Sequence, residues 1–295
     1  MQNFRTDLAE EAVGLHQSAQ EDGILQTEYY AGNHIRIVRV DITSQQASQK
    51  VGKPCGSYTT VFLPPFGDQS LQNQEDVSVI AGELSSLLPE GLILVVGLGN
   101  RDITPDAFGP RAAGQIIATR HLSGELKRSA GLEAFRPTAV LAPGVLGQTG
   151  VETVELIQSV VSSIRPAGVL VLDALASRSL DRLGCTIQLA DNGISPGSGV
   201  QNARRELSAH TLGVPVISLG VPTVVDASTL AADLLEDPSS LEDHRQVFQP
   251  RGASMIVTPR EIDLLIQRAS STAALAVNKA LHPRISVEDF QFLLH

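Results

Sequence analysis

Four short apolar runs, separated by segments of helical character, constrain the fold of this chain more than any other feature. They carry few charges, as strands covered on both faces do, and they occupy residues 92–97, 138–142, 168–172 and 214–219. Strands that alternate with helices favour an α/β fold, in which a mostly parallel, twisted sheet has helices on both faces. Two earlier strand patterns, at 34–40 and 58–63, predict small antiparallel additions.

Periodic apolar positions and capping signals predict the helices that cover this sheet. Thr149 and Glu152 have the spacing of a capping box, and Thr258 followed by Pro259 is typical of a helix start. Because no linker, repeat or low-complexity stretch interrupts the pattern, we expect residues 1–295 to form a single domain. The expected helices span residues 75–88, 110–119, 149–164, 226–236 and 258–281.

A glycine turn, Gly97-Leu98-Gly99, directly follows the strand at 92–97. A dinucleotide-binding fingerprint would need a third glycine at position 102, where this chain has Asp102, whose carboxylate would repel a pyrophosphate. We therefore interpret the glycines as parts of a tight turn that needs a positive φ. Asp102 itself is interpreted as a loop residue.

Asp106 and Asp173 are the candidate functional residues. Asp106 lies in the loop after the strand at 92–97, and Asp173 directly follows the strand at 168–172. Ligand sites of open parallel sheets lie at this carboxyl edge, and a carboxylate partly removed from water there is suited to general acid or base work. Helix capping is the alternative, with Asp106 capping the next helix and Asp173 capping residues 174–176.

Composition excludes several classes of function. The formal net charge is −10 and no basic stripe offsets it, which argues against nucleic-acid binding. No signal pattern and no apolar run of about 20 residues predicts a membrane segment, so we expect a cytoplasmic protein. Cys55 and Cys185 lack the spacing of a metal site, and no His-x-x-x-His pair indicates zinc. A single histidine that joins two distant carboxylates remains possible.

Two further features have a functional and a structural interpretation. The loop at 193–199 contains Gly197, Ser198 and Gly199, which could bind a peptide substrate or form a flexible surface loop. Asp226, near the end of another predicted strand, fits a helix cap.

Short motifs spread over most of the chain resemble those of germination protease, a family of spore endopeptidases. Each motif is short, but their order and number make the resemblance specific. The motifs are Phe4–Ala9, Val95–Asn100, Thr104–Ala107, Thr119–Leu122, Phe135–Pro137, Ala142–Val145, Thr149–Thr153, Asp173–Ser179, Asp191–Gly199, Gly220–Ala227 and Val257–Pro259.

The resemblance implies an endopeptidase that degrades small acid-soluble spore proteins during germination in the spore core. It also implies a homotetramer that is made as a zymogen. The two essential aspartates of the family correspond to Asp106 and Asp173. The processing point corresponds to the bond between Asp7 and Leu8, which would make residues 1–7 a short propeptide. Residues 7–10 also fit the capping pattern of a helix start.

The expected fold also resembles that of hydrogenase maturation peptidases, which share a Gly-x-Gly-Asn turn and bind a metal through two acids and a histidine. Our leading hypothesis is a reaction without a cofactor, in which one carboxylate activates water and the other donates a proton. A metal bridging Asp106 and Asp173 is the variant within the peptidase class. A metal-binding maturation peptidase or a metallochaperone is the alternative function.

Overall fold

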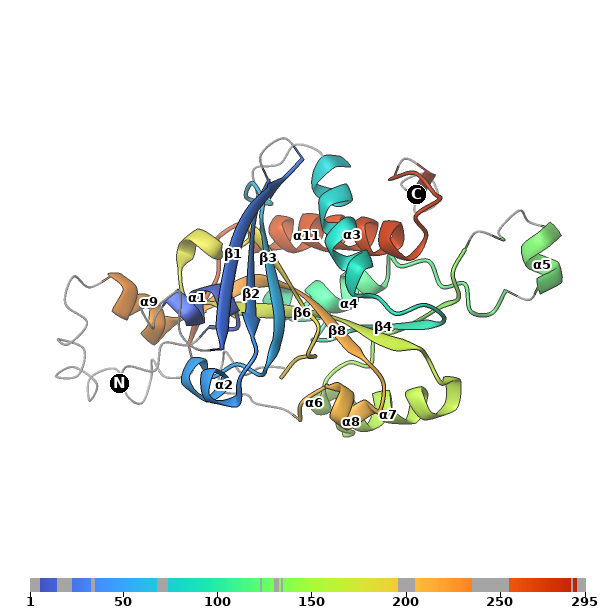
Figure 1. Cartoon of the computed structure of the whole chain (residues 1–295), viewed down its shortest axis with the longest axis horizontal. Helices are drawn as coiled ribbons and strands as arrows, with labels where there is room; N and C mark the ends of the chain where they lie inside the picture. The colour runs from blue at the N-terminus through green and yellow to red at the C-terminus, as the bar shows by residue number, and fades with distance from the viewer. Residues whose placement is uncertain are drawn as a thin grey trace.

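The computed structural model describes residues 6–14, 23–32, 35–67, 74–122, 124–129, 133, 135–195, 205–234, 255–287 and 289–290. Its strands form one sheet in the order β1-β2-β3-β7-β8-β6-β4-β5, with β9 paired to β8 (Figure 1). The strands are β1 (Ile24–Ala31), β2 (Ile35–Ile42), β3 (Gly56–Phe62), β4 (Ile93–Gly97), β5 (Thr138–Leu141), β6 (Gly168–Ser177), β7 (Thr186–Ala190), β8 (Val216–Asp226) and β9 (Ile256–Val257).

The sheet is mixed. β5, β4, β6 and β8 run parallel to one another, whereas β1, β2, β3, β7 and β9 pair antiparallel with their neighbours. The predicted α/β class is confirmed, but the antiparallel half is larger than the small additions expected. It includes β1, β7 and β9, which were not predicted. Residues 178–185, which separate β7 from β6, are too few for the helical crossover that a parallel strand needs.

Helices cover both faces of the sheet, as predicted (Figure 1). One face carries α3 (Gln74–Leu87), α4 (Phe108–Ala113) and α11 (Ile262–Leu281), and the other carries α6 (Leu146–Thr149), α7 (Thr153–Ile164) and α8 (Ala209–Leu212). The remaining helices are α1 (Ala9–Gly14), α2 (Gln45–Val51), α5 (Gly124–Ser129), α9 (Ala227–Leu234) and the short 3-10 helices η1 (Thr104–Asp106) and η2 (Leu180–Arg182).

β4 shows why a strand at the centre of the sheet can be apolar throughout. Ile93 and Val95 pack into the core under α3 and α11, while Leu94 and Val96 pack into the core over α7. All four side chains are buried. Because burying one such side chain stabilises the fold by roughly 1.5–3 kcal/mol, a strand covered on both faces favours apolar residues at every position.

The helix expected over 149–164 is present as α7, which begins four residues later, and Thr149 belongs to the separate short helix α6. α6 ends at Thr149, Gly150 adopts a φ of +69°, and α7 begins at Thr153. The Thr149 hydroxyl donates to the carbonyl oxygen of Val145 at 3.2 Å, in the preceding turn. The capping box predicted at Thr149 is therefore wrong, and that residue closes α6 instead.

The other predicted helices are present with shifted ends. α3 begins and ends one residue before the range expected, and α9 lies within its range, of which residues 235–236 lie outside the described residues. α11 ends at Leu281 as predicted but begins at Ile262, with Glu261 as its N-cap residue, so the helix start predicted at Thr258 is wrong. α4, expected over 110–119, begins at Phe108 and ends at Ala113. It ends early because the N–H groups of Thr119 and Arg120 donate to the Thr138 carbonyl oxygen, at 2.9 Å each, which draws the chain to β5.

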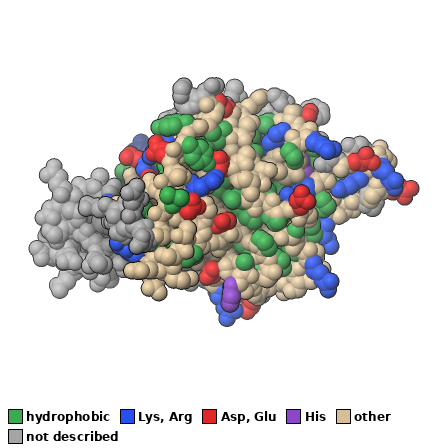
Figure 2. All heavy atoms as spheres, viewed as in Figure 1, with side chains coloured by type: hydrophobic (Ala, Val, Ile, Leu, Met, Phe, Trp, Pro, Cys, Tyr) green, Lys and Arg blue, Asp and Glu red, His purple; other side chains and the backbone are tan. Residues whose placement is uncertain are grey.

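None of the described helices is long and apolar enough to cross a bilayer. On the face shown in Figure 2, acidic and basic side chains are intermixed, with hydrophobic side chains scattered among them.

Candidate active site

The turn after β4 places Asp106 at the carboxyl edge of the parallel strands. A Cβ on Gly97 would lie 2.2 Å from the Gly109 carbonyl oxygen, so only glycine lets α4 pack this close to the strand end. Gly99 has a φ of +116°, and a Cβ there would lie 2.0 Å from the Asp106 carbonyl oxygen. The prediction of a tight turn with a positive φ is confirmed at Gly99.

The carboxylate of Asp106 interacts with this turn. Its Oδ2 accepts a hydrogen bond from the Asn100 backbone N–H at 2.7 Å. α4 begins at Phe108, and its N-cap residue is Ala107, without a side-chain capping bond. The helix-cap interpretation of Asp106 is therefore wrong.

Asp173 lies within β6 and is buried, with an exposed fraction of 5%. Because β6 continues to Ser177, no helix follows that Asp173 could cap, and the cap interpretation is wrong here too. Its Oδ1 accepts from the Ala174 N–H at 3.0 Å. Asp226, in contrast, does cap a helix: its Oδ1 accepts from the N–H of Thr229 in the first turn of α9, at 3.0 Å.

Asp106 and Asp173 line the same cavity of about 180 Å³, which we call the carboxylate cavity. The structure thus brings together the two residues that the sequence singled out. Asp102 is exposed, accepts from the Gln148 side-chain amide at 3.2 Å, and lies outside this cavity, as a loop residue would. The other residues of the wall are Asp7, Leu98, Gly99, Ile103, Pro105, Glu152, Thr153, Val154, Ala174, Leu175, Ala176, Arg205, Leu207, Thr223, Val224 and Ile256.

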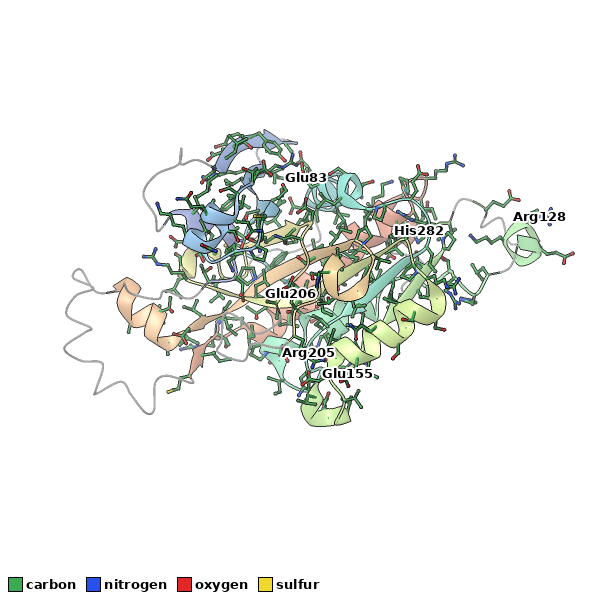
Figure 3. All side chains as sticks on the ribbon, turned by 60° about the horizontal axis from the view of Figure 1, so that its bottom comes forward. Glu83, Arg128, Glu155, Arg205, Glu206 and His282 are labelled. Atoms are coloured by element: carbon green, nitrogen blue, oxygen red, sulfur yellow. The ribbon has the colours of Figure 1, made fainter. Side chains whose placement is uncertain are left out.

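Glu152 and Arg205 add one more acid and one base to the wall. Arg205 and its neighbour Glu206 lie in the middle of the molecule, whereas Arg128 on α5 lies at its far end (Figure 3). Because a guanidinium is always charged and its planar fork matches a carboxylate, Arg205 offers the cavity a fixed positive charge for an acidic group.

The N-terminal segment, Thr6–Gly14, docks along the end of β6. The Asp7 N–H donates to the Ala176 carbonyl oxygen at 2.8 Å, and the Ala176 N–H donates to Asp7 Oδ2 at 2.9 Å. Asp7 thereby becomes part of the wall of the carboxylate cavity, together with Asp106 and Asp173. The carboxylate of Asp7 thus accepts a hydrogen bond from β6, so its role is not limited to capping α1.

Glu11 holds the same segment one helical turn further on. Its two carboxylate oxygens accept from the N–H groups of Arg178 (2.8 Å) and Ser179 (2.9 Å), and it also accepts from the Thr6 hydroxyl. Burial raises the pKa of Glu11, and these hydrogen bonds act in the opposite direction. The buried carboxyl of Glu11 therefore ties α1 to the chain that leaves β6.

A second cavity of about 140 Å³, the neighbouring cavity, shares Asp7, Asp173 and Leu175 with the first. Gln188 of β7 lies in its wall and is buried, with an exposed fraction of 7%. Gln188 Nε2 donates to the Asp7 carbonyl oxygen at 3.1 Å, and Gln188 Oε1 accepts from the Ala9 N–H at 2.8 Å. The side chain of Gln188 thus spans the peptide bonds on both sides of Leu8.

Lys53 supplies a positive charge in the neighbouring cavity. Its Nζ donates to the Thr6 carbonyl oxygen at 2.8 Å. Burial lowers the pKa of Lys53, and the negative charges of Asp7 and Glu11 oppose that shift. The ammonium group therefore lies among acidic groups of the N-terminal segment.

The side-chain atoms of the site that could bind a metal ion are mainly carboxylate oxygens. Among the residues that the structure describes, no group of three or more His, Cys, Asp or Glu side chains is arranged to hold a metal ion. The described wall of the carboxylate cavity contains no histidine or cysteine. His282, at the end of α11, lies well apart from Arg205 (Figure 3) and stacks near Phe135, with 4.8 Å between ring centroids.

Sequence reasoning missed part of the site and also named residues that the structure does not describe. Gly197, Ser198 and Gly199, proposed as a substrate loop, lie outside the described residues. Glu152, Arg205, Lys53 and Gln188 were not singled out as site residues. Gln188 had one local signal: it is the single polar residue within Ile187–Ala190, which is otherwise apolar and buried.

Comparison with known proteins agrees over the whole length. Among curated proteins, the germination protease of Caldanaerobacter subterraneus subsp. tengcongensis is 39% identical, covering 99% of this chain and 98% of its own length. Those of Clostridium perfringens (38%, 100% of both chains) and Priestia megaterium (33%, 99% and 97%) are also similar. A solved hydrogenase maturation protease, HycI from Thermococcus kodakarensis, aligns with 68% of this chain and 98% of its own at 18% identity, with a TM-score of 0.38.

A family profile described as germination protease matches residues 5–237, which include Asp7, Asp106 and Asp173. This match and the full-length relatives establish the resemblance seen in the sequence motifs. The chain is a peptidase and belongs to the germination protease family.

Proposed function

We propose that this peptidase starts the breakdown of small acid-soluble spore proteins during germination, with Asp106 and Asp173 as its catalytic pair. The observation that carries the proposal is the carboxylate cavity, whose wall contains both aspartates and also Asp7 of the chain's own N-terminal segment. A peptide segment thus already lies in the wall of the cavity that both aspartates line.

Two carboxylates that share one site cannot both ionise cheaply, so the proposed mechanism uses one ionised carboxylate and one protonated carboxyl. The ionised carboxylate takes a proton from water, whose oxygen attacks the carbonyl carbon of the scissile bond. The protonated carboxyl then donates to the leaving nitrogen as the C–N bond breaks. Each proton transfer contributes on the order of 10²–10⁴ in rate.

The chain also processes itself between Asp7 and Leu8. The hydrogen bonds from Ala176 and Gln188 hold Asp7 in the wall of both cavities. Cleavage there would release residues 1–7 as a short propeptide and convert a zymogen into the active form. Mass spectrometry after incubation should show a chain that starts at Leu8, and a fully active enzyme that retains residues 1–7 would contradict this step.

The same contacts favour an acidic residue before the cut. Asp7 Oδ2 accepts from the Ala176 N–H at 2.9 Å, and the Lys53 ammonium adds positive charge beside it. An acidic residue of a spore protein would occupy this position once the propeptide has left. We propose that the enzyme works in the spore core as a homotetramer and binds these proteins without contacting nucleic acid.

Substitution of each aspartate tests the proposal. Asp106→Asn and Asp173→Asn keep the shape of the side chain and remove its ability to exchange a proton. We expect each variant to lose cleavage of a purified small acid-soluble spore protein by a factor of at least about 10². Discrete fragments are measured by mass spectrometry, and thermal melting checks that each variant is folded.

Asp102→Asn is the matched control, because Asp102 belongs to the same loop as Asp106 but lies outside the carboxylate cavity. This control should cleave at the wild-type rate. Full activity of Asp106→Asn, or an intact spore protein after incubation with the wild-type enzyme, would refute the proposal.

A further inference from the structure

Gln188 and Asp173 lie in one row across three neighbouring strands. Gly220 of β8 pairs with Asp173 of β6 on one side and with Gln188 of β7 on the other. Directly paired residues point to the same face of a sheet, and two strand spacings separate the outer residues by about 10 Å. Gly220 has no side chain of its own, so the row presents an acid at one end and an amide at the other.

The N-terminal segment lies over this row. A Cβ on Gly220 would lie 2.5 Å from the Leu175 side chain. The Leu175 side chain therefore fills the space above Gly220 and leaves no room for a larger residue at this position. Asp7, Asp173, Gln188 and Gly220 all line the neighbouring cavity. The Asp7 carbonyl oxygen thus accepts from Gln188 at one end of the row, and Asp7 shares the wall of this cavity with Asp173 at the other end.

The orientation of the Gln188 amide is fixed by its partners. Nε2 faces the Asp7 carbonyl oxygen at 3.1 Å, and Oε1 faces the Ala9 N–H at 2.8 Å. A flipped amide would set oxygen against oxygen and N–H against N–H. The donor therefore points at the carbonyl of the bond between Asp7 and Leu8.

We infer that Gln188 is a catalytic residue, whose side-chain N–H stabilises the negative oxygen that forms on the carbonyl under attack. This role rests on the proposed function. When water adds to the carbonyl carbon, the C=O electron pair moves to the oxygen, and one water proton passes to the ionised carboxylate. A donor about 2.7–3.1 Å from that oxygen, in a site that excludes water, stabilises the transition state more than the ground state.

Gln188→Leu removes the donor while keeping a side chain of similar length. With a synthetic peptide of residues 3–14 as substrate, we expect kcat to fall by roughly 10²–10³, the usual loss for one such donor. KM should rise by less. The two hydrogen bonds lost from the bound peptide, to the Asp7 carbonyl oxygen and from the Ala9 N–H, join neutral groups, whereas the first of them strengthens as that oxygen becomes negative. Gln158→Leu is the matched control: Gln158 of α7 is exposed and donates to the Thr211 carbonyl oxygen at 2.9 Å, outside both cavities.

Gln188→Glu provides a second readout, measured only over the pH range in which thermal melting shows this variant to be fully folded, because a buried glutamate also destabilises the fold when it ionises. The ionised carboxylate cannot donate, but the protonated form can. The activity of Gln188→Glu relative to wild type, measured at each pH, should therefore rise as the pH falls. This variant also tests the inference if Gln188→Leu does not fold.

The outcomes separate this inference from the proposed function. A wild-type enzyme that leaves the peptide intact would overturn both. A wild-type enzyme that cleaves it, with a Gln188→Leu variant that changes KM but not kcat, would overturn the catalytic role of Gln188 alone. A Gln188→Glu ratio that does not vary with pH would do the same.

Discussion

Replacing Gly99 with alanine tests whether the turn after β4 holds Asp106 in its working position. The φ of Gly99 is +116°, and an added Cβ would lie 2.0 Å from the Asp106 carbonyl oxygen and 3.0 Å from its Oδ1. Ordinary contact begins at about 3.4 Å, so the Asp106 backbone must move by more than about 1 Å. Because a misplacement of about 1 Å costs roughly 10² in rate, we expect kcat to fall by at least that factor.

Gly213→Ala is the control that isolates backbone strain from the clash. Gly213 follows α8 with a φ of +73°, and nothing lies within 4 Å of an added Cβ. An alanine held in this left-handed conformation should lower the free energy of unfolding by about 1–2 kcal/mol. Since Gly213 lies outside both cavities, cleavage by this variant should stay at the wild-type rate.

The assay measures kcat on the peptide of residues 3–14 and the free energy of unfolding by chemical denaturation. We expect both glycine variants to lose stability and only Gly99→Ala to lose kcat. A folded Gly99→Ala enzyme with kcat within threefold of wild type would refute the claim that this turn positions Asp106.

Two further predictions concern pH and metals. Burial, and then the charges of Arg136 and Lys127, lower the pKa of His282 to about 4. The unfolded state therefore binds more protons than the folded state between about pH 6.5 and 4. The stabilisation by neutral His282 is fully present above about pH 6.5, and the free energy of unfolding falls by up to about 3 kcal/mol as the pH drops to 4. The free energy of unfolding of His282→Gln should decline less steeply with falling pH, and equal slopes for wild type and variant would contradict this. Exhaustive chelation should leave peptide cleavage unchanged, whereas a loss that a divalent metal restores would favour a metal bridging the two aspartates.

Local patterns located the parallel strands but not all of their ends. β4 is an apolar run, whereas β6 and β8 continue beyond the predicted ends at 172 and 219, to Ser177 and Asp226. The rule that ligands lie at the carboxyl edge of such strands indicated Asp106 and Asp173. Those patterns could not exclude helix capping, since an aspartate after a strand is compatible with both roles. Only the continuation of β6 to Ser177 and the capping geometry of α4 decided the question.

The docking of the N-terminal segment could not be predicted from local patterns, because it depends on contacts between residues far apart in the chain. Asp7 and Ala176 are joined by two hydrogen bonds, and no pattern near either residue indicates the other. The family resemblance marked the bond between Asp7 and Leu8. This bond lies beside the carboxylate cavity because Asp7 is hydrogen-bonded to Ala176 near the end of β6, and both residues are part of the cavity wall.

Gln188 escaped detection for a geometric reason. The carboxyl-edge rule finds residues at the ends of parallel strands, and β7 is antiparallel to β8. An antiparallel strand beside a parallel one brings a residue from its middle to the level of the neighbour's site, here Gln188 opposite Gly220. A lone polar residue inside an apolar strand is the sequence signal for such a position. It gains functional meaning only once the strand order places it in the same row as Asp173.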